Sequence, residues 1–331
     1  MIGTNNAAGG GGGGIAFVNT DVDFRSLDVS DPSNISQLSS ITIATGLTQY
    51  AGGGIAIDRD NNVAYTVNSG TTLTAIDISD PSNLSILDTL VFGVRLTDVV
   101  IDPTTSVVYV SDRQGGGAAG IYSIDISNPS NMSILDSHNG GVYYTDNLVD
   151  LDIDIVNKRL VAANQAGYCV VTFDISNPSS IENISFRNFN RAPASVKFSA
   201  DGANIYGTTE IASLLFTANP LSTSADNNFQ TYLYYPDAPL EISENLGLWF
   251  AAGRGTNGYL SAFSLFSNLR HAETGFYDVM GIAIDNTNNI LYTSGLGGII
   301  KVVQLNAYND WTVINTHTLT SATNTKRIAL Y

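Results

Sequence analysis

The sequence is poor in charge and in cysteine, and it has no long hydrophobic run. Only 13% of its 331 residues are charged, and its single cysteine, Cys169, excludes a disulfide framework within the chain. No segment approaches the roughly 18 uninterrupted apolar residues that a membrane-spanning helix requires. We therefore expect no membrane insertion.

Positive charge is especially scarce. The chain has four lysines, and its 30 acidic residues against 14 Lys and Arg give a formal net charge of −16. Because such a surface repels phosphate backbones, we expect no nucleic-acid partner. A lysine-poor surface of Asn, Ser, Thr and Gly is more typical of exported or virion proteins than of cytosolic enzymes. We expect an extracellular or virion-surface location.

The N-terminus lacks the features of a secretory signal. Residues 1–14, MIGTNNAAGGGGGG, contain neither a basic segment nor an apolar core. We expect no signal peptide, and export by another route or release from a virus particle. We predict a glycine-rich arm over residues 1–14, docked on protein subunits of a larger assembly, and one domain over residues 15–331.

Internal repetition is the strongest pattern in the chain. Four nearly superimposable segments are LDVSDPSNISQL from Leu27, IDISDPSNLSIL from Ile76, IDISNPSNMSIL from Ile124 and FDISNPSSIENI from Phe173. Their prolines lie 49, 48 and 49 residues apart. Weaker copies begin at Leu215, Phe263 and Val303, which gives seven units.

Each unit contains four short apolar runs bounded by turn residues. In the second unit these runs are 54–58, 63–67, 73–79 and 84–91. Short β-branched runs between Gly, Pro, Asn and Asp are typical of strands, and four strands at a period of about 40–50 residues are typical of a propeller blade. The sequence predicts an all-β, seven-bladed β-propeller of four-stranded antiparallel blades.

The two ends of the chain are predicted to complete one blade. The innermost strands are expected to begin at Ile55, Val99, Leu151, Val196, Leu240, Ile282 and Ile328. The first unit lacks such a strand, whereas the last strand, within 326–331, has no further strands after it. Pairing RIALY with IAFVN closes the ring and removes the exposed edges of an open array.

The DVSDPSN and DISNPSN segments resemble the LVIVD-repeat family of β-propellers. The resemblance covers residues 16–185 and weakens beyond, where Phe216, Ser264 and Gln304 replace the strand aspartate. It implies a propeller, often on microbial cell surfaces, without an established shared chemistry. It therefore transfers no catalytic residue.

The aspartates of the repeat have a structural explanation. We predict that they cap the following turn, because an Asp side chain accepts from backbone N–H groups two or three residues later and Pro then fixes the turn. The four aspartates are Asp28, Asp77, Asp125 and Asp174.

No motif indicates catalysis, a metal or a cofactor. No serine lies in a G-x-S-x-G elbow, and the three histidines are dispersed. Asp58, Asp60 and Asn62 open like a calcium loop whose remaining ligands are missing, and Asp150, Asp152 and Asp154 alternate along one strand. We predict no catalytic residues, no bound metal and no cofactor.

One propeller face is the candidate recognition surface. Turns that enter the innermost strands carry aromatic residues, arginines and carboxylates, a mixture typical of surfaces that bind sugars or proteins. The candidate residues are Tyr50, Arg95, Tyr144, Asp146, Arg191, Tyr235, Asp237, Tyr277 and Asp278. The alternative is that the tyrosines pack between blades.

Three charged residues share one position in consecutive innermost strands. Asp152, Lys197 and Glu241 occupy the second position, where the other strands carry Ala or Val. Since a buried charge needs a partner, we predict that Lys197 is paired on both sides and stabilises the ring.

Three functions remain open from the sequence. The leading hypothesis is a non-enzymatic structural or host-recognition protein on a bacterial virus particle, which binds protein subunits or surface glycans. The second is a microbial cell-surface or matrix propeller, as the family resemblance implies. The third is a glycan-active enzyme, for which Asp146, Asp237 and Asp278 are the available carboxylates.

Overall fold

The structure is a computed structural model of the 331-residue chain, and its described residues form strands and turns only. The described residues are 14–43, 53–67, 70–113, 120–138, 147–189, 192–209, 214–218, 220–221, 228–230, 240–243, 245–252, 259–264, 270–274, 276, 279–307, 310–320 and 325–331.

The described strands form seven four-stranded antiparallel sheets. One sheet holds β28 (Thr325–Leu330), β1 (Ile15–Thr20), β2 (Asp23–Asp28) and β3 (Ser36–Thr42). The next three hold β4 (Ile55–Asp58), β5 (Val63–Val67), β6 (Thr72–Asp77) and β7 (Ser85–Val91); β8 (Leu96–Asp102), β9 (Val107–Asp112), β10 (Ile121–Asp125) and β11 (Ser133–His138); and β12 (Leu148–Asp154), β13 (Arg159–Asn164), β14 (Cys169–Asp174) and β15 (Glu182–Asn188).

The remaining three sheets follow in chain order. They hold β16 (Pro193–Phe198), β17 (Ile205–Thr209), β18 (Leu214–Ala218) and β19 (Asn228–Gln230); β20 (Leu240–Ser243), β21 (Leu248–Ala252), β22 (Tyr259–Ser264) and β23 (Arg270–Thr274); and β24 (Val279–Asp285), β25 (Ile290–Gly295), β26 (Ile299–Ala307) and β27 (Asp310–Thr318).

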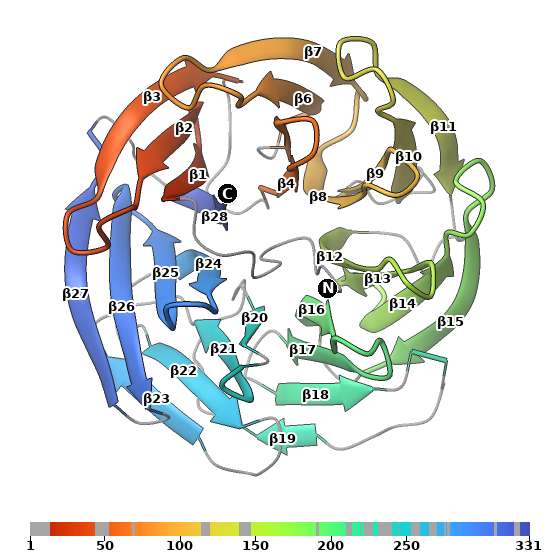
Figure 1. Ribbon diagram of the computed structural model, residues 1–331. Helices are drawn as coiled ribbons and strands as arrows, with labels where there is room; N and C mark the ends of the chain where they lie inside the picture. The colour runs from red at the N-terminus through yellow and green to blue at the C-terminus, as the bar shows by residue number, and fades with distance from the viewer. Residues whose placement is uncertain are drawn as a thin grey trace.

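The sheets stand side by side around one axis, as Figure 1 shows. The innermost strands contact each other in the order β28, β4, β8, β12, β16, β20, β24 and back to β28. They are mostly buried, whereas the outermost strands β3, β7 and β11 are largely exposed. The predicted all-β propeller is confirmed.

The sheet that joins both ends of the chain has the predicted pairing. Strand β28 pairs antiparallel with β1, with Leu330 opposite Ala16 and Ile328 opposite Val18. Figure 1 shows the blue C-terminal strand beside the red N-terminal one. The Tyr331 ring extends the seam, since it packs edge-on against Phe17 with ring centroids 5.9 Å apart.

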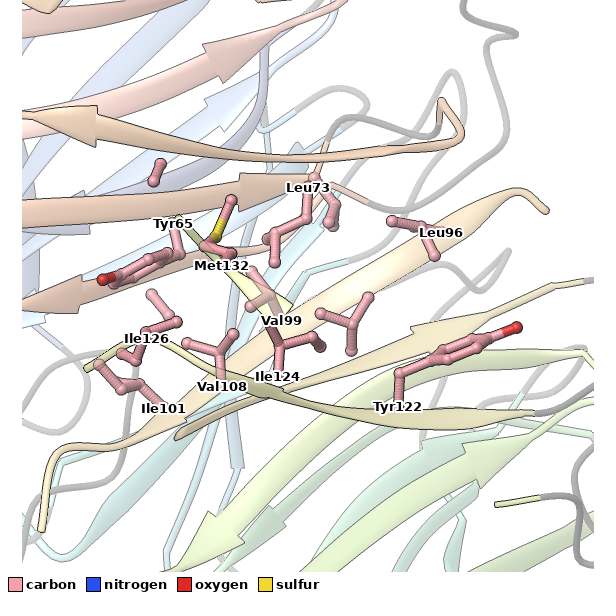
Figure 2. Close-up of a cluster of buried hydrophobic side chains, with 14 of the residues drawn as sticks. Tyr65, Leu73, Leu96, Val99, Ile101, Val108, Tyr122, Ile124, Ile126 and Met132 are labelled. Atoms are coloured by element: carbon pink, nitrogen blue, oxygen red, sulfur yellow. The ribbon is translucent and has the colours of Figure 1, made fainter. Parts of the chain in front are cut away.

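The hydrophobic core is divided among the spaces between neighbouring sheets. In Figure 2, Tyr65 and Leu73 of one sheet pack against Val99, Val108 and other aliphatic side chains of the next. Burying an aliphatic side chain of this size stabilises the fold by roughly 1.5–3 kcal/mol. Because each layer formed by described residues belongs to two sheets, the packing couples those neighbouring sheets.

The turn aspartates of the repeat cap their turns as predicted. The backbone N–H groups of the residues two positions later donate to the carboxylates at 2.8–2.9 Å, in the pairs Ser30–Asp28, Ser79–Asp77, Ser127–Asp125 and Ser176–Asp174. These turns also connect sheets, since the Ser26 and Ser123 hydroxyls each donate at 2.5 Å to a proline carbonyl of the next sheet's turn.

Five innermost strands begin three residues earlier than predicted. The corrected starts are Leu96, Leu148, Pro193, Val279 and Thr325, instead of Val99, Leu151, Val196, Ile282 and Ile328. A β-bulge explains the difference, because each of these strands shifts register by one residue just after its start. In the sequence, the polar residues beside the bulges look like part of a turn, so the strands were predicted to start too late.

Candidate functional site at the ring axis

The bulges of the innermost strands place charged side chains at the ring axis. Asp98, Asp150 and Arg327 each come directly after the extra residue of a bulge. Bulges redirect the side chains that follow them, and strand alternation then returns to the same face two residues later. Asp152, Lys197 and Glu241 lie on the next level of the axis, and we call these six residues the axial cluster.

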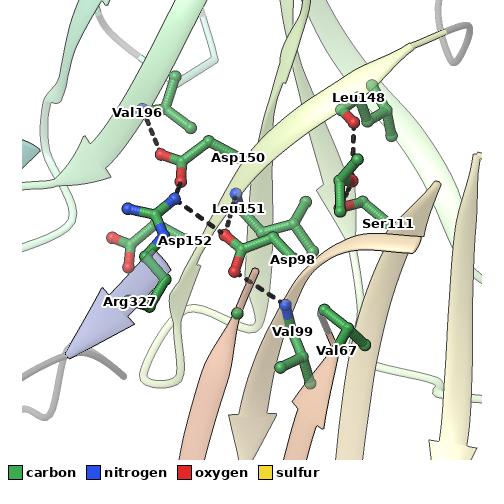
Figure 3. Close-up of polar contacts among 12 residues, drawn as sticks. Val67, Asp98, Val99, Ser111, Leu148, Asp150, Leu151, Asp152, Val196 and Arg327 are labelled. Atoms are coloured by element: carbon green, nitrogen blue, oxygen red, sulfur yellow. Dashed lines mark hydrogen bonds and ion pairs between the residues drawn. The ribbon is translucent and has the colours of Figure 1, made fainter. Parts of the chain in front are cut away.

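Arg327 crosses the ring. Its Nη2 atom lies 2.5 Å from Asp150 Oδ1 and 4.0 Å from Asp98 Oδ2 (Figure 3). The arginine belongs to β28, whereas the aspartates belong to β12 and β8, which are not neighbours of β28 in the ring. The C-terminal strand is therefore held by β1 beside it and by charge across the axis.

Lys197 is paired on both sides, as predicted. Its Nζ atom lies 3.4 Å from Asp152 Oδ1 and 3.8 Å from Glu241 Oε2. These three side chains are at most 5% exposed and come from three successive sheets. The pairing supplies the counter-charges that a buried lysine requires.

The axial aspartates also bond the backbone of the next sheet. Asp98 Oδ2 accepts from Leu151 N at 3.0 Å, and Asp150 Oδ2 accepts from Val196 N at 2.9 Å. An innermost strand has no neighbouring strand on its axial edge, and buried N–H groups need acceptors. The carboxylates supply these acceptors and link consecutive strands.

A glycine makes room for one of these carboxylates. A Cβ atom at Gly54 would lie 2.3 Å from Asp98 Oδ1 and 2.4 Å from Val99 N. Any side chain at position 54 would displace the Asp98 carboxylate or the backbone behind it. The glycine thus belongs to the structural basis of the axial cluster.

Burial shifts the ionisation of the cluster. Desolvation raises the pKa of Asp98 to about 7 against the opposing charge of Arg327, and it raises the pKa of Glu241 to about 7 against that of Lys197. It also raises the pKa of Asp152. Burial lowers the pKa of the Lys197 ammonium, but Asp152 and Glu241 outweigh this and raise it overall.

The arrangement is suited to holding strands together. The axial carboxylates contact cations or backbone N–H groups, and their side chains are at most 6% exposed. Asp154, further along β12, pairs with Arg159. Among the described residues, no group of three or more His, Cys, Asp or Glu side chains is placed to hold a metal ion.

Most of the predicted recognition residues lie outside the described residues. These are Tyr50, Tyr144, Asp146, Arg191, Tyr235, Asp237, Tyr277 and Asp278. The remaining one, Arg95, is exposed directly before β8, and its carbonyl accepts from Arg113 N at 2.8 Å. The recognition face stays a prediction.

Half of the axial cluster was not predicted from the sequence. Asp98, Asp150 and Arg327 each lie two residues before the second position, where Lys197 and its partners were found. Aligning that earlier position across the units would have placed two acids and one arginine on one level. The bulges hid this signal, because the strands were expected to start after these residues.

The comparisons with known proteins agree with a β-propeller. The LVIVD repeat matches residues 60–89, 108–139 and 160–185, so these three segments are LVIVD repeats. The family resemblance is confirmed there, whereas the copy that begins at Leu27 is outside the matched ranges. No curated protein sequence matches this chain.

Several solved structures share the fold at low sequence identity. A candidate 6-phosphogluconolactonase from Bacteroides fragilis is 12% identical, with a TM-score of 0.76 over 96% of this chain and 97% of that one. Its counterpart from Bacteroides uniformis is 11% identical, with a TM-score of 0.75 over 96% and 99%. A protein from Lactobacillus plantarum is 13% identical, with a TM-score of 0.76 over 96% and 99%. At these identities the likeness shows the fold alone.

No helix within the described part of the chain is long and apolar enough to cross a membrane.

Proposed function

We propose that this protein is a non-enzymatic interaction module in which seven sheets act as the seven blades of one closed, rigid ring. The observation that carries the proposal is the axial cluster. In many proteins buried charges serve chemistry, but here the carboxylates are occupied by backbone N–H groups, Arg327 and Lys197. The axis is thus built for rigidity, which lowers the entropic cost of binding through the turns that it supports.

The binding surface in this proposal is the face where chain segments enter the innermost strands. Arg95 is exposed there, and the exposed Tyr168 lies in the β13–β14 turn at the same end of its sheet. The proposed contacts are the tyrosines, arginines and acids predicted for this face, and the proposed ligands are glycans or protein subunits. Aromatic faces beside hydrogen-bonding acids suit sugars in particular.

We place the protein on the outside of an assembly, as a virion-associated protein of a bacterial virus that binds subunits or host glycans. Its lysine-poor polar surface and net charge of −16 support this location. The LVIVD repeats favour the second candidate, a propeller on a microbial cell surface. Neighbouring genes discriminate between them, with capsid and tail genes expected for the first and secretion genes for the second.

A glycan-array measurement tests the recognition face. The wild-type protein is compared with Tyr235→Ala and Tyr277→Ala, and with Phe186→Ala as a control at an exposed aromatic residue of the outermost strand β15. We expect selective binding that is lost in the first two variants and retained in the control. Equal binding by all four proteins would place the ligand elsewhere.

Activity assays test the enzyme alternative. The relatives named as candidate 6-phosphogluconolactonases make hydrolysis of 6-phosphogluconolactone the first reaction to measure, followed by glycan cleavage. We expect no turnover, because the axial carboxylates are already engaged by backbone N–H groups, Arg327 and Lys197. Turnover that disappears on substitution of Asp146, Asp237 or Asp278 would replace the binding proposal.

A further inference from the structure

The axial cluster holds more acidic than basic groups. Its members are Asp98, Asp150, Asp152, Glu241, Lys197 and Arg327. With all six ionised, four carboxylates and two cations would leave a net charge of −2. The carboxylate side chains are at most 6% exposed, so water screens this charge poorly. The cluster therefore favours binding protons.

The cluster is connected directly to the seam of the ring. Arg327 supplies one of its two cations and belongs to β28, which closes the ring against β1. The Arg327 backbone N–H also donates to Asn19 Oδ1 of β1 at 2.8 Å. Opening the seam would remove Arg327 from Asp150 and admit water to the buried carboxylates.

We propose that the axial cluster is a proton-controlled latch for ring closure. With two protons bound to its carboxylates, the cluster is neutral and Arg327 holds β28 across the axis. When these protons leave, two uncompensated negative charges remain in a dry site. Opening the seam then becomes more favourable, because it returns the charges to water.

The direction of the pH response follows from burial. Desolvation raises the pKa of Asp98 and of Glu241 to about 7, although Arg327 and Lys197 oppose the shift. A carboxyl whose pKa is higher in the folded than in the unfolded protein binds more protons when folded. Its contribution to stability is complete below its unfolded pKa, about 4, and is lost as the pH rises through about 7.

The surroundings of Asp98 contain few other titratable groups within reach. Strand β12 presents Asp150 and Asp152, and β28 presents Arg327. Other ionisable residues on the packed strands have partners of their own. Asn61 donates to Asp58 of β4, Tyr122 donates to Asp112 of β9, and Arg159 pairs with Asp154 of β12. The charge of Asp58 also acts on Tyr65 of β5.

The surroundings of Glu241 are simpler. Strand β16 presents Lys197, Asp152 and Arg327 act from further away, and β21 carries no ionisable residue. On β24, Asp285 accepts from Thr287 and Asn288 at the far end of the strand. The response of Glu241 is therefore governed mainly by Lys197 and by burial.

Hydrogen exchange measures how readily the β1–β28 seam opens. The opening equilibrium of the β1 and β28 amides, corrected for the intrinsic pH dependence of exchange, is compared at pH about 5 and about 8 in the full chain. We expect the opening constant to rise at least about tenfold at the higher pH. We expect Glu241→Gln to reduce this ratio, and the exposed Asp60→Asn control to leave it unchanged. Equal constants at both pH values, or an unchanged ratio in Glu241→Gln, would overturn the proposal.

A direct titration of the axial carboxyls tests the latch without any substitution. Carbon-13 carboxyl shifts are followed by NMR in the wild-type protein labelled at Asp and Glu. We expect two buried carboxyls of the folded protein to titrate between about pH 6 and 8. If every carboxyl titrates below about pH 5, the latch is refuted.

Discussion

Aspartates at the outer turns and aspartates at the ring axis respond to this fold in opposite ways. Hydrogen bonds from the Ser30 hydroxyl and N–H lower the pKa of Asp28, and those from Ser79 do the same for Asp77. At the axis, burial raises the pKa of Asp98. The same side chain caps a solvated turn in one place and carries a costly buried charge in the other.

The outer turns and the ring axis also differ in their sequence pattern. The turn aspartates recur in the first four repeats, because these units share the same turn. The axial residues break the repeat, since equivalent positions in other described strands carry alanine, valine, glycine or serine. The repeated residues thus build each sheet, and the residues that depart from the repeat hold the ring together.

Removing the C-terminal strand β28 should have the largest effect on stability. Deleting residues 325–331 removes the β28–β1 pairing, buried Ile328 and the cation at Asp150. We expect a loss of at least about 5 kcal/mol in the free energy of unfolding, measured by urea denaturation. An unchanged melting temperature after deletion of only Ile328–Tyr331 would contradict the closure model.

Breaking the lysine pairing at the axis should have the second-largest effect on stability. Lys197→Met leaves Asp152 and Glu241 buried without their cation. We expect a loss of about 3–5 kcal/mol in unfolding free energy near pH 8, and a smaller loss near pH 5, where Glu241, whose pKa burial raises to about 7, is protonated. The matched control Lys158→Met, at a pair whose lysine side chain is 29% exposed, should cost less. Equal losses at both pH values would exclude charge as the cause.

Breaking a contact between the outer strand β11 and the turn before β15 should have an intermediate effect on stability. Asp136 Oδ2 accepts from Ile181 N of the next sheet at 2.7 Å. Asp136→Ala removes this acceptor, and we expect a loss of about 1–3 kcal/mol in thermal or urea unfolding. Asp136→Asn keeps an oxygen in place and should recover most of the loss. If both variants unfold alike, the hydrogen bond is not responsible.

Removing a turn cap should have the smallest effect. Asp77→Ala leaves Ser79 N without its acceptor at 2.9 Å in an exposed turn that water can reach. We expect a loss of about 1 kcal/mol or less near pH 7. The loss should shrink as the pH falls below about 4, because protonation of Asp77, whose pKa is lowered in the fold, removes the wild-type advantage. A loss that grows on acidification would contradict the capping role.

The sequence predicts the sheets well because their signals are local. The turn at Asp77 and the apolar runs on either side of it act within a few residues, and the repeat shows them several times. The β28–β1 pairing was also predictable, since the first unit lacks the strand that the last residues supply. The bulges were missed because a one-residue register shift leaves no apolar pattern.

The site was only partly predictable for a related reason. Asp152, Lys197 and Glu241 occur in successive repeats, so their neighbourhood follows from the ring order. Arg327 and Asp150 are separated by 177 residues and meet across the axis, which no repeat spacing encodes. The backbone hydrogen bonds to the axial carboxylates likewise depend on the angle between adjacent sheets.

The outer strands hold a second set of bulges, with consequences for how such rings associate. Register shifts near the start of β3, β7, β11 and β15 leave Leu38, Leu87, Leu135 and Ile184 outside the regular pairing. A bulged edge is a poor template for another strand, so it resists sheet-to-sheet polymerisation.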